Sequence, residues 1–414
     1  MTYRRSLTVS LLPVAVVLAA CGPGDTLPMG DAPGETTSSM STAPLPVAGR
    51  STVYAPHGMV ATSQPLASTA ALRILQEGGN AFDAAIAASA VLSLVEPHMT
   101  GLGGDMFALA WSADEGGLVG LDASGRAGAL MSPEQIRADG HDDVPYQGPG
   151  SVTVPGAIAG WGALNERYGS LPLSRILAPA IELAEVGFPV SPIIARQWAN
   201  EEDLLRDDPG ATATYLPGGS PPAAGDWFTN PGFATSLRMI ADQGPAAMYG
   251  GALGQRVVEG LQELGGYLTL DDREAMAVEW VEAISADYKG TTLWELPPAV
   301  QGVAALQMLE ILEPFDLGSM GHNSPEYLHH LIEAKKIAFA DLAHVSDRDF
   351  LQVNPGQLLE ADYIDARRAL LDPERAAERQ EPGEFATSTE TVYLAVADRD
   401  GNMVSFIHSI YEYF

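Results

Sequence analysis

The sequence predicts an α/β fold in which helices flank strands in an αββα arrangement. Strand patterns occur at residues 54–62 and 106–111, and again at 392–409 near the end of the chain. Helical patterns dominate from residue 150 onward between them. No internal repeat and no shift in composition divides residues 51–414, so we expect one folded part there.

Two helices are predicted directly after the first strand pattern, Tyr54–Thr62. Pro65 stands at the first-turn position that proline prefers, and apolar residues recur at helical spacing up to Gly78-Gly79. Asn80 can cap the second helix, residues 81–95. The side of this helix opposite its apolar stripe is mostly Ala and Ser, so we expect it to be buried nearly all round.

A glycine-rich loop, GLGGD at residues 101–105, precedes the apolar strand Met106–Trp111. It lacks the full GxGxxG spacing and follows a helix, which disfavours a phosphate cradle. Close packing of backbone segments is the better explanation. Further helices are predicted in VPGAIAGWGALNERYG, LSRILAPAIELAEVGF, GALGQRVVEGLQELGG, VAALQMLEILEPF and SPEYLHHLIEAKKIAFADLAHV, the last being the longest, and a hairpin in AISADYKGTTLWELPP.

Composition and charge exclude several classes of function. Of the 414 residues 46% are hydrophobic, which excludes a disordered chain. The net charge of −31 excludes binding to nucleic acid or anionic lipid through a basic surface. We interpret this acidity as a solubility adaptation, with an acidic functional patch as the alternative.

Residues 1–21 are predicted to be a targeting segment. Arg4 and Arg5 precede an apolar stretch, Leu7–Leu18, that is too short to span a bilayer. Leu18 to Cys21 resembles a bacterial lipoprotein signal, in which the cysteine is lipidated. Cys21 is the only cysteine, so no intramolecular disulfide forms. An ordinary secretory signal is the alternative, and both place the protein outside the cytoplasm, on the periplasmic or extracellular side.

Residues 22–50 are rich in Gly, Pro, Ser and Thr and are predicted to be a flexible tether. No later segment has 18 uninterrupted apolar residues, so no second membrane candidate is expected.

Several kinds of catalytic site find no support in the sequence. It contains no HExxH motif, no paired cysteines and no GxSxG elbow. His329 and His330 are adjacent on a predicted helix and point in different directions. We therefore predict neither a metal site nor a cofactor.

The segment TSTETVYLAVADRDGNMVSF, residues 387–406, suggests a different chemistry. Val392–Ala397 reads as a strand covered on both faces, Asp400-Gly401 as a hairpin turn, and residues 403–409 as the returning strand. If the peptide bond before Thr391 is cut, this residue gains an α-amino group with a pKa of about 8. That amine can activate the threonine hydroxyl as a nucleophile. The alternative is that Thr391 is only a β-branched residue that begins a strand.

Four segments resemble the gamma-glutamyltranspeptidase family in order and spacing: residues 58–109, 154–188, 265–298 and 391–406. The resemblance implies an N-terminal-nucleophile (Ntn) hydrolase with an αββα sandwich, made as a proenzyme that cuts itself. The implied scissile bond is Glu390–Thr391. It divides a large subunit, residues 51–390, from the start of a small subunit, residues 391–414, and the two form a heterodimer.

The resemblance also implies the reaction and its residues. The Thr391 hydroxyl would attack the γ-glutamyl amide of glutathione or a similar compound, and water or an amino acid would resolve the ester. Ser409 would support the nucleophile. Arg126 would hold the substrate carboxylate, with a structural salt bridge as the alternative. Tyr411 stands where an asparagine usually contacts the substrate.

The versions GLGGDMFAL and SFIHSIY resemble the branch that includes cephalosporin-acylase-like members. The alternatives to a γ-glutamyl hydrolase or transferase are therefore a glutaryl or cephalosporin-type acylase of the same fold and a non-catalytic surface-binding lipoprotein. By resemblance the small subunit would continue past Phe414, so the fold is expected to be incomplete at its C-terminus and this chain inactive alone.

Overall fold

The computed structural model describes residues 53–351, 354–380 and 392–410. From Tyr54 onward the described residues form one compact unit. Among the described residues, no helix combines the length and the apolar character that crossing a bilayer requires.

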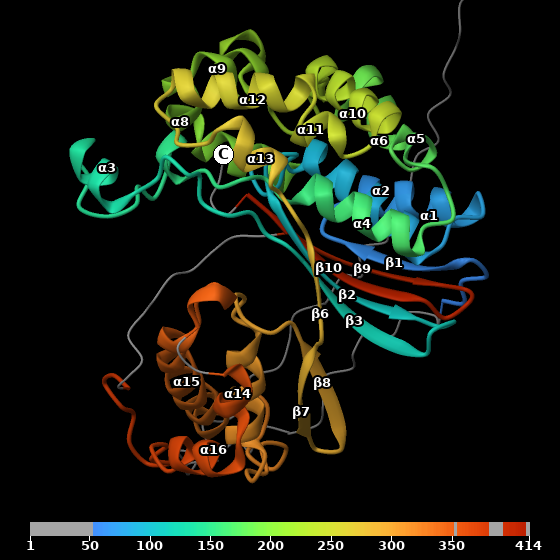
Figure 1. Ribbon diagram of the computed structural model, residues 1–414. Coiled ribbons are helices and arrows are strands. Elements are labelled where there is room, and N and C mark those ends of the chain that lie inside the picture. The colour runs from blue at the N-terminus through green and yellow to red at the C-terminus, as the bar shows by residue number, and fades with distance from the viewer. Residues whose placement is uncertain (1–52, 352–353, 381–391, 411–414) are drawn as a thin grey trace, which may run out of the picture. The chain divides into compact units, whose positions relative to one another are not determined.

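A six-stranded antiparallel sheet forms the centre of this unit (Figure 1). β9 and β10 come from near the end of the chain, yet they lie between β1 and β2 from its beginning. The Asp400-Gly401 turn joins them, with Gly401 at a positive φ of 90°, as predicted. In sheet order the strands are β1 (Gly58–Thr62), β9 (Val392–Asp398), β10 (Met403–Ser409), β2 (Asp105–Ser112), β3 (Gly117–Ala123) and β6 (Glu279–Val281).

Helices α1 (Pro65–Gln76), α2 (Ala81–Val95) and α4 (Ala157–Tyr168) cover one face of the sheet (Figure 1). α2 contacts β9 and β10, and α4 contacts β2 and β3. All 15 residues of α2 are buried, as its sequence predicted. The predicted helix starts are also confirmed, because Pro65 begins α1 and the Asn80 side chain accepts hydrogen bonds from the first turn of α2.

The other face of the sheet is apolar and largely open within the described residues. Leu394 of β9 is fully buried under the helices, whereas its neighbour Tyr393 is 53% exposed. Met59, Met403 and Ile407 on the adjoining strands are exposed as well. The prediction that the 392–397 strand is covered on both faces is therefore wrong for this part of the chain, because the helices pack on one side only.

Most remaining helices extend the helical layer and share its hydrophobic core. The segment LSRILAPAIELAEVGF, predicted as one helix, forms two that meet at Leu177, because Pro179 lacks an amide hydrogen and its ring disfavours a continuous helix. The bounds are α3 (Pro133–Ala138), α5 (Leu173–Ile176), α6 (Ala178–Val186), α7 (Pro192–Asn200), α8 (Glu202–Asp207), α9 (Pro209–Tyr215), α10 (Pro231–Gln243), α11 (Ala246–Tyr249), α12 (Ala252–Glu263) and α13 (Leu270–Glu274), with a small ribbon of β4 (Phe188–Pro189) and β5 (Trp227–Phe228).

A second hydrophobic cluster is built by α14 (Gly302–Leu312), α15 (Pro325–Ala340) and α16 (Ala361–Arg368). The predicted hairpin, β7 (Ile284–Tyr288) and β8 (Thr291–Glu295), contacts α14. Its two turn residues, Lys289 and Gly290, have positive φ values of 49° and 81°, which suits a tight hairpin turn.

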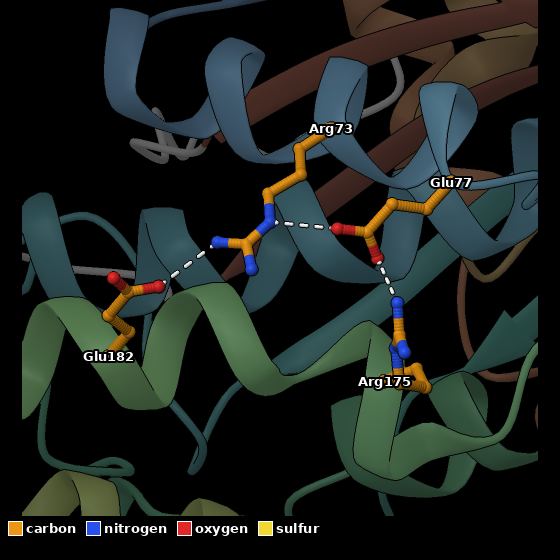
Figure 2. Close-up of polar contacts among 4 residues, drawn as sticks. All are labelled: Arg73, Glu77, Arg175 and Glu182. Carbon is orange, nitrogen blue, oxygen red and sulfur yellow. Dashed lines mark hydrogen bonds and ion pairs between the residues drawn. The ribbon is translucent and has the colours of Figure 1, made fainter.

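An ion-pair chain joins α1 to α5 and α6 on the protein surface (Figure 2). Glu77 accepts from Arg73 Nε at 3.0 Å and from Arg175 Nη2 at 2.5 Å, and Arg73 also reaches Glu182 at 3.0 Å. The hydrogen bonds from Arg175 and then Arg73 lower the pKa of Glu77. Its contribution to stability is therefore present above the ordinary value of 4.5 and is lost as the pH falls through the lowered pKa.

We expect Glu77→Gln to lower the free energy of unfolding by no more than about 1 kcal/mol, because both arginines are at least half exposed. Denaturant unfolding in low and high salt measures this. The difference between variant and wild type should shrink in about 1 M salt, where screening acts over ~3 Å. A larger, salt-independent loss would contradict a surface electrostatic role.

Candidate functional site

One end of the sheet brings together several of the residues that the sequence singles out. Val392 begins β9 and pairs with His408, the next-to-last residue of β10. Ser409 pairs with Asp105 at the start of β2, and Met106 pairs with Ala123 at the end of β3. Residues 124–126 follow β3 directly. The sheet end thus gathers Ser409, Asp105 and the turn that carries Arg126.

Four predicted site residues, Cys21, Glu390, Thr391 and Tyr411, lie outside the described residues. Thr391 is nevertheless the sequence neighbour of Val392, whose pairing with His408 is observed. Ser409 is the residue after His408, and His408 is the strand partner of Val392, which directly follows Thr391.

The glycine loop packs against this end of the sheet, as predicted. A Cβ atom on Gly104 would lie 2.1 Å from the Ser409 carbonyl oxygen, so only glycine fits. The Gly104 carbonyl accepts from the backbone N–H groups of Gly156 and Ala157 at the start of α4. This close backbone contact accounts for Gly104, whereas a Cβ atom on Gly103 would meet nothing within 4 Å and one on Gly101 only Ile410 at 3.6 Å.

His408 lies inside a buried polar chain behind the sheet end. Its Nε2 donates to the Gly101 carbonyl at 2.9 Å, and its Nδ1 accepts from the Ser89 hydroxyl at 2.8 Å. The Ser89 oxygen accepts from Trp161 Nε1 at 3.1 Å. Burial lowers the pKa of His408 to about 4. The imidazole is therefore neutral near pH 7, with its proton on Nε2, and anchors β10 to α2 and the glycine loop.

Asp105 is a site residue that the sequence analysis missed. Its Oδ1 accepts from the backbone N–H of Gly125 at 3.1 Å and of Gly156 at 3.0 Å. Burial of the carboxyl group raises its pKa to about 7, although these two hydrogen bonds act in the opposite direction. A carboxylate that ends a glycine run directly before a buried strand was the available signal.

Arg126 pairs with Asp349, which lies in a 3₁₀ turn at Arg348–Phe350. The two side chains are 2.7 Å apart and about 60% exposed (63% and 60%). This hydrogen bond is the main reason why the pKa of Arg126 is raised. The Arg126 carbonyl also accepts from Val154 N at 2.9 Å, which fixes the backbone of the turn.

A cavity of 230 Å³ opens beside Arg126. Four acidic residues line it together with the single arginine: Asp122, Asp272, Glu279 and Asp347. A shallower hollow of 510 Å³ between α4 and α11 is lined mainly by small and apolar residues and contains none of the predicted site residues. The smaller cavity is therefore the candidate substrate site.

No metal centre is evident in the part of the chain that the structure describes. There, no three His, Cys, Asp or Glu side chains come together as ligands.

Comparison with known proteins gives the family. A family model described as gamma-glutamyltranspeptidase matches residues 67–414. The chain belongs to the gamma-glutamyltranspeptidase family. The matched region includes the glycine loop, the Arg126 turn and both strands that follow the predicted cut, β9 and β10.

Relatives in the gamma-glutamyltranspeptidase family carry two kinds of name. The chain is 40% identical to the glutathione hydrolase-like YwrD proenzyme of Bacillus subtilis (strain 168), covering 85% of this chain and 66% of the relative. It is 39% identical to the acylase ACY 1 proenzyme of Pseudomonas sp. (strain SE83), covering 85% and 65%. The chain thus spans about two thirds of the length of these relatives.

A solved structure in this family confirms the fold class. The cephalosporin acylase from Bacillus halodurans superposes with a TM-score of 0.82 and 41% sequence identity, covering 91% of this chain and 70% of that one. The α/β Ntn-hydrolase fold predicted from the sequence is therefore correct.

Proposed function

We propose that this protein is a self-processing Ntn amide hydrolase and acyltransferase that acts on γ-glutamyl amides through Thr391. The observation that carries the proposal is the sheet end itself. Strand pairing puts Val392, the residue after Thr391, beside the end of β10, while Asp105 and the Arg126 turn occupy the adjoining strands. A nucleophile at position 391 would have a hydroxyl residue and a carboxylate-binding arginine supplied by separate, firmly paired strands.

The proposed chemistry has two stages. During self-processing, the Thr391 hydroxyl attacks the Glu390 carbonyl carbon, the C–N bond breaks, and an ester to Thr391 forms. Water hydrolyses this ester, which frees the Glu390 carboxylate and the Thr391 α-amine. In turnover, that amine takes the proton from the hydroxyl as the oxygen attacks the γ-glutamyl amide. The leaving amine receives the proton, and water or an amino acid then cleaves the γ-glutamyl ester.

The charge of the cavity supports a γ-glutamyl substrate. Four acidic side chains and one arginine line it, and Asp349 already pairs with that arginine. A γ-glutamyl group carries an ammonium beside its carboxylate, so opposite charges can face both the acids and Arg126. A glutaryl group has the carboxylate alone and would meet net repulsion from this lining.

A glutaryl or cephalosporin-type acylase is the second candidate. It is supported by the relative named an acylase and by the superposition on a cephalosporin acylase. Rates on γ-glutamyl and glutaryl anilides separate the two candidates, because only the first compound offers an α-amino group. Faster hydrolysis of the glutaryl anilide would favour the acylase.

Replacing Thr391 by alanine is expected to abolish both self-cleavage and amide hydrolysis. Mass spectrometry and N-terminal sequencing of the protein as its host makes it should find a fragment that begins at Thr391. Thr391→Ala should yield only uncut chain, whereas Thr389→Ala, two residues away, should still be cut. An uncut wild-type chain would instead support the non-catalytic binding protein.

Paired variants decide whether Arg126 binds substrate or only forms a salt bridge. If it holds the substrate carboxylate, we expect Arg126→Gln to raise KM at least about 10-fold, as the loss of a charge-assisted hydrogen bond predicts. Asp349→Asn removes the same salt bridge but frees the guanidinium, so KM should stay the same or fall. Equal increases in KM for both variants would show that the salt bridge alone matters.

The N-terminal segment suggests where the protein works, and the predicted cut suggests how it is assembled. We propose export by residues 1–20 and lipid attachment at Cys21, supported by the lipoprotein-like signal that ends there. Self-cleavage at Glu390–Thr391 would give a heterodimer of large and small subunits. Metabolic labelling with a fatty-acid analogue, compared between wild type and Cys21→Ser, tests the anchor.

A further inference from the structure

We propose that Asp105 is a positioning residue, which fixes the turn Ser124–Arg126 at the sheet end and thereby the Arg126 guanidinium. The inference rests on the proposed function for its catalytic consequence, because the position of Arg126 matters to turnover only if it meets substrate. Its structural part is independent of any activity.

Asp105 accepts hydrogen bonds from two backbone segments that lie beside Arg126. One oxygen of its carboxylate joins two chain segments, since it accepts from Gly125 N, just before Arg126, and from Gly156 N. Val154 N, two residues before Gly156, donates to the Arg126 carbonyl. The backbone is thus fixed before Arg126, at Gly125 N, and at the Arg126 carbonyl. Asp105 binds both the turn itself and the segment 154–156 that contacts this carbonyl.

The fit around the carboxylate is tight. A Cβ atom on Gly125 would lie 1.4 Å from the Val154 carbonyl oxygen, and one on Gly156 would lie 1.8 Å from the Ala123 carbonyl oxygen. The backbone segments 123–126 and 154–156 are therefore in direct contact, with no room for side chains between them. Gly156 is buried and Gly125 half-buried in this contact, so their N–H groups need acceptors. Gly156 N also donates to the Gly104 carbonyl at 3.1 Å, whereas Gly125 N donates to Asp105.

The acceptor is an acid without a basic partner. Among the hydrogen bonds and ion pairs of the described side chains, Asp105 contacts no arginine, lysine or histidine. The charged or titratable groups that face it are Asp122, which raises its pKa, and Tyr249. Its role is therefore not a salt bridge. An ionised carboxylate is a stronger acceptor for backbone N–H groups than a neutral amide oxygen, which suits a residue that must hold a turn.

A merely structural role is the alternative, since Gly156 N opens helix α4 and Asp105 could serve as its cap. The chain offers a matched control. The carboxylate of Asp83, a fully buried residue, also accepts backbone N–H groups, those of Asn80 and Ser170, but it lies on α2 away from the Arg126 turn. Loss of either carboxylate should cost stability, whereas only loss of Asp105 should affect Arg126.

Hydrogen exchange in the full chain tests the structural part without any substrate. In Asp105→Ala, peptides covering residues 123–127 should exchange at least about 10-fold faster than in wild type, as the loss of one hydrogen bond of about 1.4 kcal/mol predicts. Asp105→Asn, which keeps an acceptor oxygen, should change them much less. Asp83→Asn should leave them unchanged. Unchanged exchange in Asp105→Ala would overturn the proposal.

Kinetics on a γ-glutamyl anilide test the consequence for turnover. Asp105→Ala should raise KM more than it lowers kcat, and it should add no further increase in an Arg126→Gln background, because both changes act on one contact. Additive effects on KM would overturn the link to Arg126. If Asp105→Ala does not fold, Asp105→Asn is measured instead. The wild-type KM should rise about 2- to 5-fold more than that of the variant from pH 8 to 6, as the charge-assisted bonds weaken. The Thr391 amine titrates in both proteins, so an equal rise in both would overturn the link.

The two proposals fail in different ways. If the wild-type protein is never cut and hydrolyses no γ-glutamyl amide, the proposed function is wrong. Hydrogen exchange would still decide whether Asp105 holds the turn. If the wild type is active but the Asp105 variants change neither hydrogen exchange nor KM, only the inference about Asp105 is wrong.

Discussion

Replacing Asp341 by alanine should lower the free energy of unfolding by about 3 to 5 kcal/mol, the range found when one partner of a buried ion pair is removed. Asp341 is 1% exposed and lies 2.9 Å from Arg367, itself nearly buried. Gln307 also donates to Asp341 Oδ2 at 3.1 Å. Burial raises the pKa of Asp341 despite the attraction of Arg367, so removing the carboxylate would leave the buried positive charge of Arg367 without its acidic partner.

A neighbouring pair provides the control. Asp365 pairs with Arg368, but its side chain is 70% exposed. Asp365→Asn should therefore change the free energy of unfolding by less than about 1 kcal/mol. Replacing both buried partners, as in Asp341→Leu with Arg367→Met, should recover most of the loss, because no charge is then left unpaired. Denaturant unfolding of the four proteins measures this. Similar losses for Asp341→Ala and Asp365→Asn would refute the argument from burial.

The pH dependence of stability should contain two opposing contributions from the sheet end. Between pH 4 and 6.5 the unfolded chain binds a proton at His408 that the folded protein excludes, because the folded pKa is about 4. Stability therefore falls as the pH drops through this window, by about 1.4 kcal/mol per pH unit and about 3 kcal/mol in total.

Asp105 acts in the opposite direction. Its folded pKa of about 7 exceeds the ordinary value of 3.8, so the folded protein binds the extra proton between these values. Stability is therefore lost as the pH rises from about 4 to 7. Since the two contributions offset one another, the wild type should be less sensitive to pH in this window than either group alone would make it.

Single variants separate the two contributions. Asp105→Asn should steepen the loss of stability on acidification, because the opposing contribution of Asp105 is then removed, whereas His408→Gln should make stability fall more, or rise less, than in wild type as the pH rises from 4 to 7. Urea unfolding at half-unit intervals, compared with wild type, measures both slopes. Variant slopes that differ from wild type in the same direction would contradict the assignment.

Much of the fold was predictable because its signals are local. Pro65, Asn80 and the Lys289-Gly290 turn each specify backbone geometry within a few residues. The break at Leu177 has a local cause as well, in Pro179, and was missed because apolar periodicity continues through it. The open sheet face near Tyr393 could not be inferred from an apolar strand, since the pattern does not state which face a helix will cover.

The sequence by itself determined the family resemblance, the α/β class and the position of the predicted nucleophile, Thr391. Only the tertiary structure decided the environment of that position. Asp105 bonds to residues 20 and 51 positions away, and His408 bonds to a serine 319 positions away. Periodicity and capping reflect forces between residues close in the chain, whereas desolvation and the pKa shifts that follow from it depend on which distant segments pack together.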